Sequence, residues 1–314
     1  MPRFDVTIAG ELNLDLILYG LPIELPRERE LLANRMMLTL GSSSAIVAHN
    51  LAALGSRVGF QSRIGTDELG EIALKRLSAG GVDTSLVRRS ENANTGLTVI
   101  LQHDPWRNIL TYSGTIAELS LTDLDLKYLS DSRHFHLSSF YLQSSLRSDV
   151  SELLRHLKAA GLTTSLDTND DPEDRWADDL RDVFRYVDVF LPNEREARKI
   201  ARTENTDEAI AILSGMVPTL VVKLGTKGAM ARQGNKEFRS SAIPVTVVDP
   251  VGAGDSFDAG FLHQYIHGSD VAVCLEWGNL AGALSTTRPG GTEAFRDAEY
   301  RNKFLREHAR SISP

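Results

Sequence analysis

The chain has 314 residues, 42% hydrophobic and 24% charged, which is enough ordinary globular sequence for one large domain or a domain with a small appendage. Its net charge is −8 and no run of Lys or Arg stands out, so we expect neither nucleic acid nor a membrane surface as partner. Cys274 is the single cysteine, which excludes an intramolecular disulfide. Without a signal peptide or a long apolar run, we expect a cytoplasmic protein.

Short apolar runs alternate with amphipathic segments along most of the chain. Strands are predicted at 4–9, 58–62, 135–138, 163–167, 187–191 and 220–224. Helices are predicted at 43–54, 68–79, 150–160, 193–202, 207–216 and 271–284. This alternation predicts an α/β fold, with a central, mostly parallel sheet flanked by helices on both faces.

Two segments break the alternation, at residues 12–40 and 95–112. The second contains two strand-like runs around residues 103–107, and together the segments predict a small antiparallel sheet outside the main one. An ordinary surface hairpin is the alternative. The core then comprises the remaining three segments, residues 1–11, 41–94 and 113–314.

The most informative stretch lies at residues 245–261. A β-branched run from Val245 to Val248 predicts a buried strand end, after which a glycine turn leads into an apolar helix. The amides of Gly252, Ala253 and Gly254 fall at the helix N-terminus, where unpaired N–H groups favour an anion. Asp255 at that same end suits a base acting beside an anion hole, with a simple helix cap as the alternative.

Residues 249–257, Asp-Pro-Val-Gly-Ala-Gly-Asp-Ser-Phe, resemble the C-terminal signature of the ribokinase-like (PfkB) carbohydrate kinases. The resemblance implies a ribokinase-like fold and ATP-dependent transfer of the γ-phosphoryl group to a hydroxyl of a sugar or sugar-like molecule. Asp255 would be the base and the amides of Gly252 to Gly254 the anion hole. Segments 12–40 and 95–112 would form a β lid over the sugar site, through which a homodimer can form.

Candidate acceptor-binding residues lie near the start of the chain. Asn13 and Asp15 follow the first strand, where an α/β sheet gathers ligands, and they match the family's Gly-x-x-Asn-x-Asp pattern. Turn chemistry alone is the alternative. Residues 41–55 resemble the family's N-terminal signature and add Gly41 and Ser42 as substrate-binding candidates. Ser42 stands where the family has a second glycine, and Ile46 stands where it has a sugar-binding Asn.

Nucleotide and metal candidates come from the second half. Asn193 and Glu196 match the family's Asn-x-x-Glu motif, in which Glu196 acts on Mg²⁺ through water; the same pair predicts a helix-capping box. The resemblance places further residues at ATP, namely Lys223, Gly225, Gly228 and, near the adenine, Asn279. It also implies a monovalent cation such as K⁺, held by Asp249 and the carbonyls of Val251, Ser285, Arg288 and Gly290.

Two other functions remain open from the sequence. A nucleoside kinase shares this fold, and aromatic lid residues such as Tyr19 or Trp106 facing Asp255 would favour it. A non-catalytic sugar- or nucleotide-sensing protein is the other alternative. No P-loop or dinucleotide-binding glycine pattern is present. Because Ile46 replaces the usual Asn, the identity of the acceptor stays open.

Overall fold

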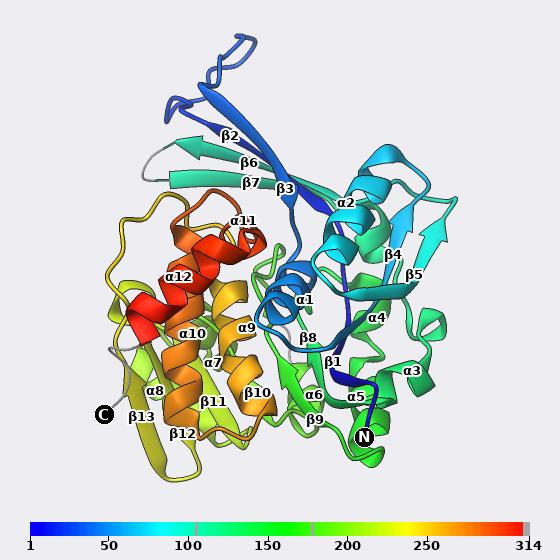
Figure 1. Cartoon of the computed structure of the whole chain (residues 1–314), viewed down its shortest axis with the longest axis vertical. Coiled ribbons are helices and arrows are strands. Elements are labelled where there is room, and N and C mark those ends of the chain that lie inside the picture. Colours follow the sequence, from blue (N-terminus) through cyan, green and yellow to red (C-terminus); the bar gives the residue numbers. More distant parts are fainter. Residues whose placement is uncertain (104–105, 177–178, 310–314) are drawn as a thin grey trace.

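The computed structural model describes residues 1–103, 106–176 and 179–309. A nine-stranded sheet forms its centre, in the order β13-β12-β11-β10-β9-β8-β1-β4-β5 (Figure 1). All neighbours from β11 to β5 are parallel, and β12 and β13 add an antiparallel edge. The strands are β1 (Phe4–Ala9), β4 (Val58–Gly65), β5 (Asp83–Ser90), β8 (Ser132–Leu137), β9 (Thr163–Leu166), β10 (Val189–Phe190), β11 (Thr219–Lys223), β12 (Ala229–Gln233) and β13 (Lys236–Ser240).

Helices cover both faces of this sheet, as β11 illustrates. Leu220 and Val222 join one apolar core with α5, α6 and α8, whereas Val221 joins another with α1 and α9. Strands buried on both faces read as continuous apolar runs, the pattern by which the sequence predicts them. The helices are α1 (Ser43–Ala53), α2 (Glu68–Ala79), α3 (Leu126–Ser130), α4 (Ser144–Arg147), α5 (Val150–Ala159), α6 (Leu180–Phe184), α7 (Glu194–Ala201), α8 (Thr206–Ser214), α9 (Ala253–Ile266), α10 (Val271–Thr286), α11 (Glu293–Arg296) and α12 (Ala298–Ala309).

A second sheet projects from the core beside α2 and above α11 (Figure 1). Its strands are β2 (Leu14–Tyr19), β3 (Arg35–Leu40), β6 (Leu97–His103) and β7 (Trp106–Tyr112), in the order β3-β2-β6-β7. The expectation of an antiparallel sheet is wrong at its centre, because β2 and β6 are parallel. They continue from β1 and β5, which run in the same direction in the core, and therefore enter the small sheet in the same direction. Part of the predicted turn, residues 104–105, lies outside the described residues.

The register gives the small sheet, hereafter the lid, two different faces. Asp15 is paired with Thr98, and Thr98 with Thr111, on a face that also carries Ile17 and Ile100. Ile17 and Ile100 pack with Val251 of the core, so this is the inner face. The outer face is apolar and its exposed large side chains are Met36, Trp106, Leu110 and Tyr112.

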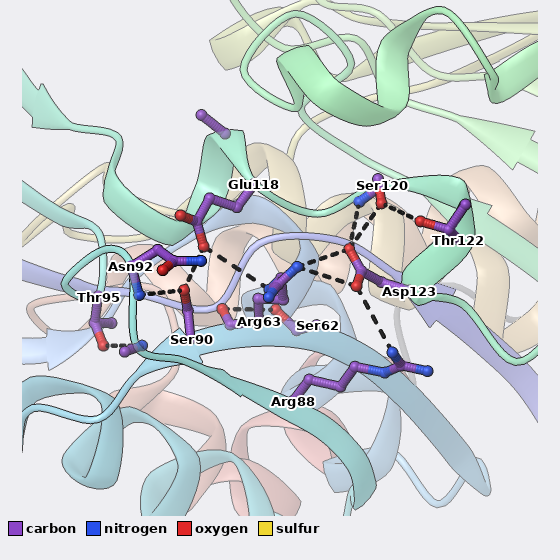
Figure 2. A network of polar contacts seen from close by, with 12 residues as sticks. Ser62, Arg63, Arg88, Ser90, Asn92, Thr95, Glu118, Ser120, Thr122 and Asp123 are labelled. Carbon is purple, nitrogen blue, oxygen red and sulfur yellow. Dashed lines mark hydrogen bonds and ion pairs between the residues drawn. The ribbon is translucent and has the colours of Figure 1, made fainter.

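A polar network fixes the chain segments that enter and leave the lid (Figure 2). Arg63 of β4 donates to both carboxylate oxygens of Asp123 at 3.0 Å, and Ser90 donates to Glu118 at 2.5 Å. The Gly65 amide donates to Thr95 Oγ1 at 2.9 Å, two residues before β6. The network therefore supports the base of the lid.

The predicted strand end at Val245–Val248 is wrong. These residues form no strand, and Val247 and Val248 are 58% and 51% exposed. The amides of Val248 and Asp249 instead bond to the Thr286 carbonyl at the end of α10. β-branched residues favour strands only where a neighbouring strand is available, and here none is. Among the described residues, no helix combines the length and apolar character needed to span a membrane.

Candidate active site

The candidate residues gather at the carboxyl edge of the main sheet. Asn13 follows β1, Lys223 ends β11, and α9 begins at Ala253. A bridge between Asn193 and Lys223 brings the start of α7 to the same edge. Ligands of open α/β sheets bind at this edge, because the connections there diverge to opposite faces.

The turn before α9 depends on close backbone contact. Gly252 has φ 74°, and a Cβ there would lie 2.4 Å from the α-carbon of Gly291, so no other residue fits without displacement. The Ala253 amide donates to the Pro250 carbonyl at 3.3 Å. Within the described chain the amides of Gly252 and Gly254 donate no hydrogen bond. These two amides are therefore the better anion-hole candidates, and Ala253 is the weaker one.

Asp255 lies in the first turn of α9 and is buried. The N-cap is Gly252 and the helix start has no side-chain cap, so the capping alternative for Asp255 does not hold. Burial, and then the Asp167 carboxylate, raise the pKa of Asp255 to about 6, while Lys223 and Ser43 act in the opposite direction. A carboxylate with this pKa is ionised at neutral pH and is a stronger base than an exposed Asp.

On the acceptor side, Asp15 is 6% exposed and its carboxylate receives no hydrogen bond from the described residues. Burial, with the charges of Asp255 and Asp249, raises the pKa of Asp15 to about 7. The Asn13 side chain donates to the Leu14 carbonyl at 3.2 Å and reaches Thr98 Oγ1 at 3.5 Å. A buried carboxylate without a donor is costly unless a ligand supplies one.

Gly41 and Ser42 form the backbone next to the Asp15 carboxylate. A Cβ on Gly41 would lie 2.1 Å from Asp15 Oδ1, so glycine leaves room for that carboxylate. Ser42 has φ 59° and ψ 132°, a conformation that glycine adopts far more readily. Its hydroxyl donates to the Glu11 carbonyl at 2.9 Å, which holds the serine in place. Ser42 therefore adopts a backbone conformation typical of glycine, and the substitution strains this position instead of producing a different turn.

The Ile46 side chain packs against the glycine turn before α9 and is buried there. It is 2% exposed, and its Cδ1 lies 3.3 Å and 2.7 Å from the Cβ positions that Gly252 and Gly291 would have. One helical turn on, the Asn50 amide donates to Ser256 Oγ and to the Gly291 carbonyl, each at 3.0 Å. The Asn50 side-chain amide is therefore used in hydrogen bonds within the protein, and Asn50 does not replace the missing Asn.

Asn193 and Glu196 form the predicted capping box at the start of α7. Glu196 Oε2 accepts from the Asn193 amide at 2.8 Å, and the Asn193 side chain accepts from the Glu196 amide at 2.9 Å. Burial and the Asp167 charge raise the pKa of Glu196 to about 8. Both carboxylate oxygens contact Asn193, so Glu196 fits a magnesium role through water and not a direct one.

Lys223 is bound to carboxylates. Its Nζ lies 2.6 Å from Asp167 Oδ2 and 3.2 Å from each oxygen of Asp258. Burial alone would lower the pKa of Lys223, but these carboxylates raise it above its ordinary value. A Cβ on Gly254 would lie 3.6 Å from this Nζ, so the ammonium is next to the anion-hole turn.

Two of the three remaining nucleotide candidates, Gly228 and Asn279, meet at Ser240. A Cβ on Gly228 would lie 2.1 Å from the Ser240 carbonyl, and Asn279 donates to that carbonyl at 3.0 Å. Gly225 has φ 59° and begins the short 3-10 turn η3 (Gly225–Lys227). The structure thus brings Gly228 and Asn279 together, and Gly225 follows β11 two residues after Lys223.

The monovalent-cation candidates cluster around Asp249. Its carboxylate accepts from the Val251 amide at 2.9 Å, the Gly290 amide at 3.1 Å and the Tyr19 hydroxyl at 2.6 Å. In the described chain the carbonyls of Val251, Arg288 and Gly290 accept no hydrogen bond, whereas that of Ser285 accepts weakly from the Arg288 amide at 3.4 Å. Three unused carbonyls beside a carboxylate fit a K⁺ ion.

Two contacts escape prediction from the sequence. The first is the contact between Asp258 and Lys223. In the sequence Asp258 indicates no more than a favourable charge in the first turn of α9, although its spacing of three from Asp255 places both on one helical face. The hydrogen bond from Tyr19 of β2 to Asp249 joins lid and core, and no local pattern indicates it, since the residues are 230 positions apart.

A buried Asp, unused amides at a helix N-terminus and polar side chains after β1, gathered at one sheet edge, are the arrangement expected of a phosphotransferase with an alcohol acceptor. A family model described as pfkB family carbohydrate kinase matches residues 3–298. The chain belongs to this family, as its C-terminal signature predicted, and it is an ATP-dependent kinase.

Three similar proteins illustrate the family's range. The 2-dehydro-3-deoxygluconokinase of Bacillus subtilis is 30% identical over 281 residues, 85% of this chain and 86% of that protein. The cytidine kinase of Thermococcus kodakarensis is 29% identical over 280 residues, 87% and 93% of the two chains. A structure from E. coli in complex with ATP and Mg²⁺ has a TM-score of 0.83 and 28% identity, covering 97% of this chain and 100% of that one. The predicted ribokinase-like fold with a β lid is confirmed.

Proposed function

We propose that the protein transfers the γ-phosphoryl group of ATP to a hydroxyl of a sugar or a sugar-like acid. The observation that carries this proposal is the placement of Asp255, with its raised pKa, between the unused amides of Gly252 and Gly254 and the unpaired carboxylate of Asp15. Within the described chain, the two amides and the Asp15 carboxylate lack hydrogen-bond partners that a substrate would supply.

In the proposed reaction Asp255 accepts the proton of the acceptor hydroxyl as its oxygen attacks the γ-phosphorus. Asn13 and Asp15 hold neighbouring hydroxyls, and Asp15 can accept from two at once. The amides of Gly252 and Gly254, at the positive end of α9, stabilise the charge on the transferring phosphoryl group. The protein thus contributes mainly position and fixed charge, as phosphoryl transfer requires.

Two cations fit the site. Mg²⁺ arriving with ATP would neutralise phosphate charge, and Glu196, closed in its capping box, would act on it through water. K⁺ would be held by Asp249 and the carbonyls of Val251, Arg288 and Gly290, with Ser285 a weaker donor. The nucleotide would lie along the side defined by Gly225, Gly228 and Asn279.

The acceptor is proposed as a sugar or sugar acid because the Bacillus subtilis relative is named for such a substrate. Ile46 places an apolar side chain against the turn where other members carry an Asn, so the acceptor needs no hydroxyl at that point. A compound lacking one hydroxyl, such as a deoxy sugar acid, satisfies this condition.

A nucleoside kinase is the second candidate, favoured by the similarity to a cytidine kinase. Its predicted marker, an aromatic lid residue facing Asp255, is not met by Trp106, and among the described residues Tyr19 makes its polar contact with Asp249 and not with Asp255. The Tyr19 hydroxyl is bound to Asp249, and Trp106 lies on the outer face of the lid and is 68% exposed. The contacts therefore favour the sugar.

The test is ATP consumption with a panel of neutral sugars, deoxy sugars, aldonic and keto-deoxy acids, and nucleosides. We expect turnover with a sugar or sugar acid and none with nucleosides. Turnover with nucleosides alone would establish the second candidate. Ligand binding without turnover for every compound would support the sensing protein instead.

We further propose a homodimer through the outer face of the lid. Met36, Trp106, Leu110 and Tyr112 leave that face apolar, and exposed apolar sheet faces commonly mark interfaces. Leu110→Lys should convert a dimer to a monomer in sedimentation velocity, whereas Ile23→Lys, an exposed apolar residue outside the lid strands, should not. A monomeric wild type at micromolar concentration would contradict the proposal.

A further inference from the structure

A buried charge cluster lies behind the anion-hole turn. It consists of the Lys223 ammonium and the carboxyl groups of Asp167 and Asp258, whose side chains are 12%, 1% and 0% exposed. They come from three separate elements, because Lys223 ends β11, Asp167 follows β9, and Asp258 lies in α9. The cluster therefore joins the sheet edge to the helix that carries Asp255.

Its geometry directs the ammonium at the turn. Asp167 holds Nζ from one side at 2.6 Å, and Asp258 holds it from the helix side at 3.2 Å to both oxygens. A Cβ added to Gly254 would have this Nζ as its nearest neighbour, at 3.6 Å. Without the carboxyl of Asp258, Lys223 keeps one anchor and is free to swing away from α9.

We propose that Asp258 is a positioning residue, which together with Asp167 fixes the Lys223 ammonium behind Gly254, where it adds permanent positive charge to the anion hole. The inference rests on the proposed function, since it assigns the ammonium to the phosphoryl group in transfer. Fixed charge in a water-excluded site acts strongly because nothing must reorient as the reaction proceeds.

A structural role alone explains this arrangement poorly. Burying a charged pair costs desolvation energy that the attraction between the charges only partly recovers, so apolar residues would stabilise the same space as well or better. The cost is understandable if the ammonium acts on a group outside the cluster, and the adjacent Gly254 amide marks where that group would bind.

The charge state of Asp258 supports this view. Burial, reinforced by the neighbouring Asp167 carboxylate, raises the pKa of Asp258 well above its ordinary value, although Lys223 opposes the shift. Burial also acts to raise the pKa of Asp167, but Lys223 and its hydrogen bonds hold that pKa below the usual value. The two shifts point in opposite directions, so Asp167 is the carboxyl that stays ionised more readily beside the ammonium and Asp258 the one that takes up a proton more readily.

The test compares Asp258→Asn, which keeps a neutral acceptor, with Asp258→Leu, which keeps only the shape. Two readouts apply: kcat with the best acceptor, and the ratio of MgADP to MgATP dissociation constants from calorimetry, which measures the contribution of the γ-phosphate. We expect Asp258→Leu to lower kcat roughly tenfold and the ratio roughly fivefold, and Asp258→Asn to stay within about twofold of wild type.

The matched control is a second lysine–aspartate pair at the opposite edge of the sheet. Lys158 Nζ lies 2.7 and 2.8 Å from the oxygens of Asp188, which precedes β10. Asp188→Leu removes the same kind of contact far from Asp255. Its melting temperature should fall while both readouts remain within about twofold of wild type.

Lys223→Met provides a second route if Asp258→Leu fails to fold. It should lower kcat roughly a hundredfold and bring the dissociation-constant ratio toward one. The inference is overturned if folded Asp258→Leu or Lys223→Met keeps both wild-type values, or if Asp188→Leu changes them equally. A wild type without turnover contradicts the proposed function alone, since the binding ratio still reports on the ammonium.

Discussion

The acceptor side and the phosphoryl side of Asp255 differ in how their charged groups are paired. On the acceptor side, the Asp15 carboxylate is buried and receives no hydrogen bond from the described residues. On the phosphoryl side, Lys223, Asp167 and Asp258 satisfy one another within 3.2 Å. The acceptor carboxylate would be completed by its ligand, while the charged side chains of the phosphoryl side are paired beforehand and only the amides of Gly252 and Gly254 remain unused in the described chain. Selectivity should therefore reside in the first and rate in the second.

The largest effect is expected where the two sides meet. Asp255→Ala removes the proposed base, so kcat should fall about a hundredfold or more while the dissociation constant for MgATP changes little. Single-turnover assays and calorimetry measure the two quantities. Asp270→Ala, which removes the exposed N-cap carboxylate of α10 beyond the far end of α9, is the control and should retain turnover. Near-normal turnover of Asp255→Ala would refute its role as base.

Asp15→Ala tests the acceptor side alone. Losing two hydrogen bonds to a charged group should lower kcat/KM for the acceptor at least about a hundredfold, because each contributes about 1.5–3 kcal/mol. The KM for ATP should stay within about twofold. If kcat/KM fell equally for the acceptor and for ATP, Asp15 would support the whole site. The distinction between the acceptor side and the phosphoryl side would then be wrong.

The pH profile gives the next effect. Asp255 must be ionised to accept a proton, and its pKa is raised to about 6, so kcat should fall as the pH falls through that value. At about pH 5 the rate should be roughly tenfold below its plateau. A plateau that extends to about pH 4.5 would mean that the base titrates like an exposed carboxylate.

Tyr19→Phe probes the link between lid and core. It removes the hydroxyl that donates to Asp249 at 2.6 Å but keeps the ring packed against the Ile17, Ile100 and Val251 cluster. We expect acceptor kcat/KM to fall about three- to tenfold and the K⁺ concentration for half-maximal activity to change. Tyr112→Phe, on the outer face, should alter neither. If Tyr19→Phe leaves both quantities unchanged, the hydrogen bond from Tyr19 does not couple the lid to the Asp249 site.

The smallest effect concerns stability. Ser42→Gly should relieve backbone strain at φ 59° but lose the hydrogen bond to the Glu11 carbonyl, for a net gain of about 1 kcal/mol in the free energy of unfolding. Urea denaturation measures the change. A loss of stability would show that the hydroxyl contact outweighs the strain.

What the sequence predicts well is local. The glycine turn before Asp255, the capping box of Asn193 and Glu196, and the strands buried on both faces follow from residue spacing and backbone preference. The nucleotide, metal and substrate roles of individual residues stay predictions. Lid boundaries at residues 12–40 and 95–112 likewise remain a proposal.

What the sequence does not reveal depends on distant partners. Whether Val245–Val248 forms a strand depends on a neighbour, which a local pattern cannot supply. The parallel pairing of β2 with β6 follows from the directions of β1 and β5 in the core. The family resemblance places Lys223 at ATP, and no local pattern indicates its two carboxylate partners, which lie 56 and 35 positions away.

The parallel pair at the centre of the lid also bears on how the chain folds. Leu14 pairs with Leu97, so β2 must wait for a long stretch of chain to fold between them. Contacts so distant in sequence form slowly, because the entropy of closing the loop is lost before they stabilise anything. We expect the main sheet to form first and the lid last. A partly folded chain would then present its phosphoryl side without an acceptor site, and newly made enzyme would bind nucleotide before it could phosphorylate sugar.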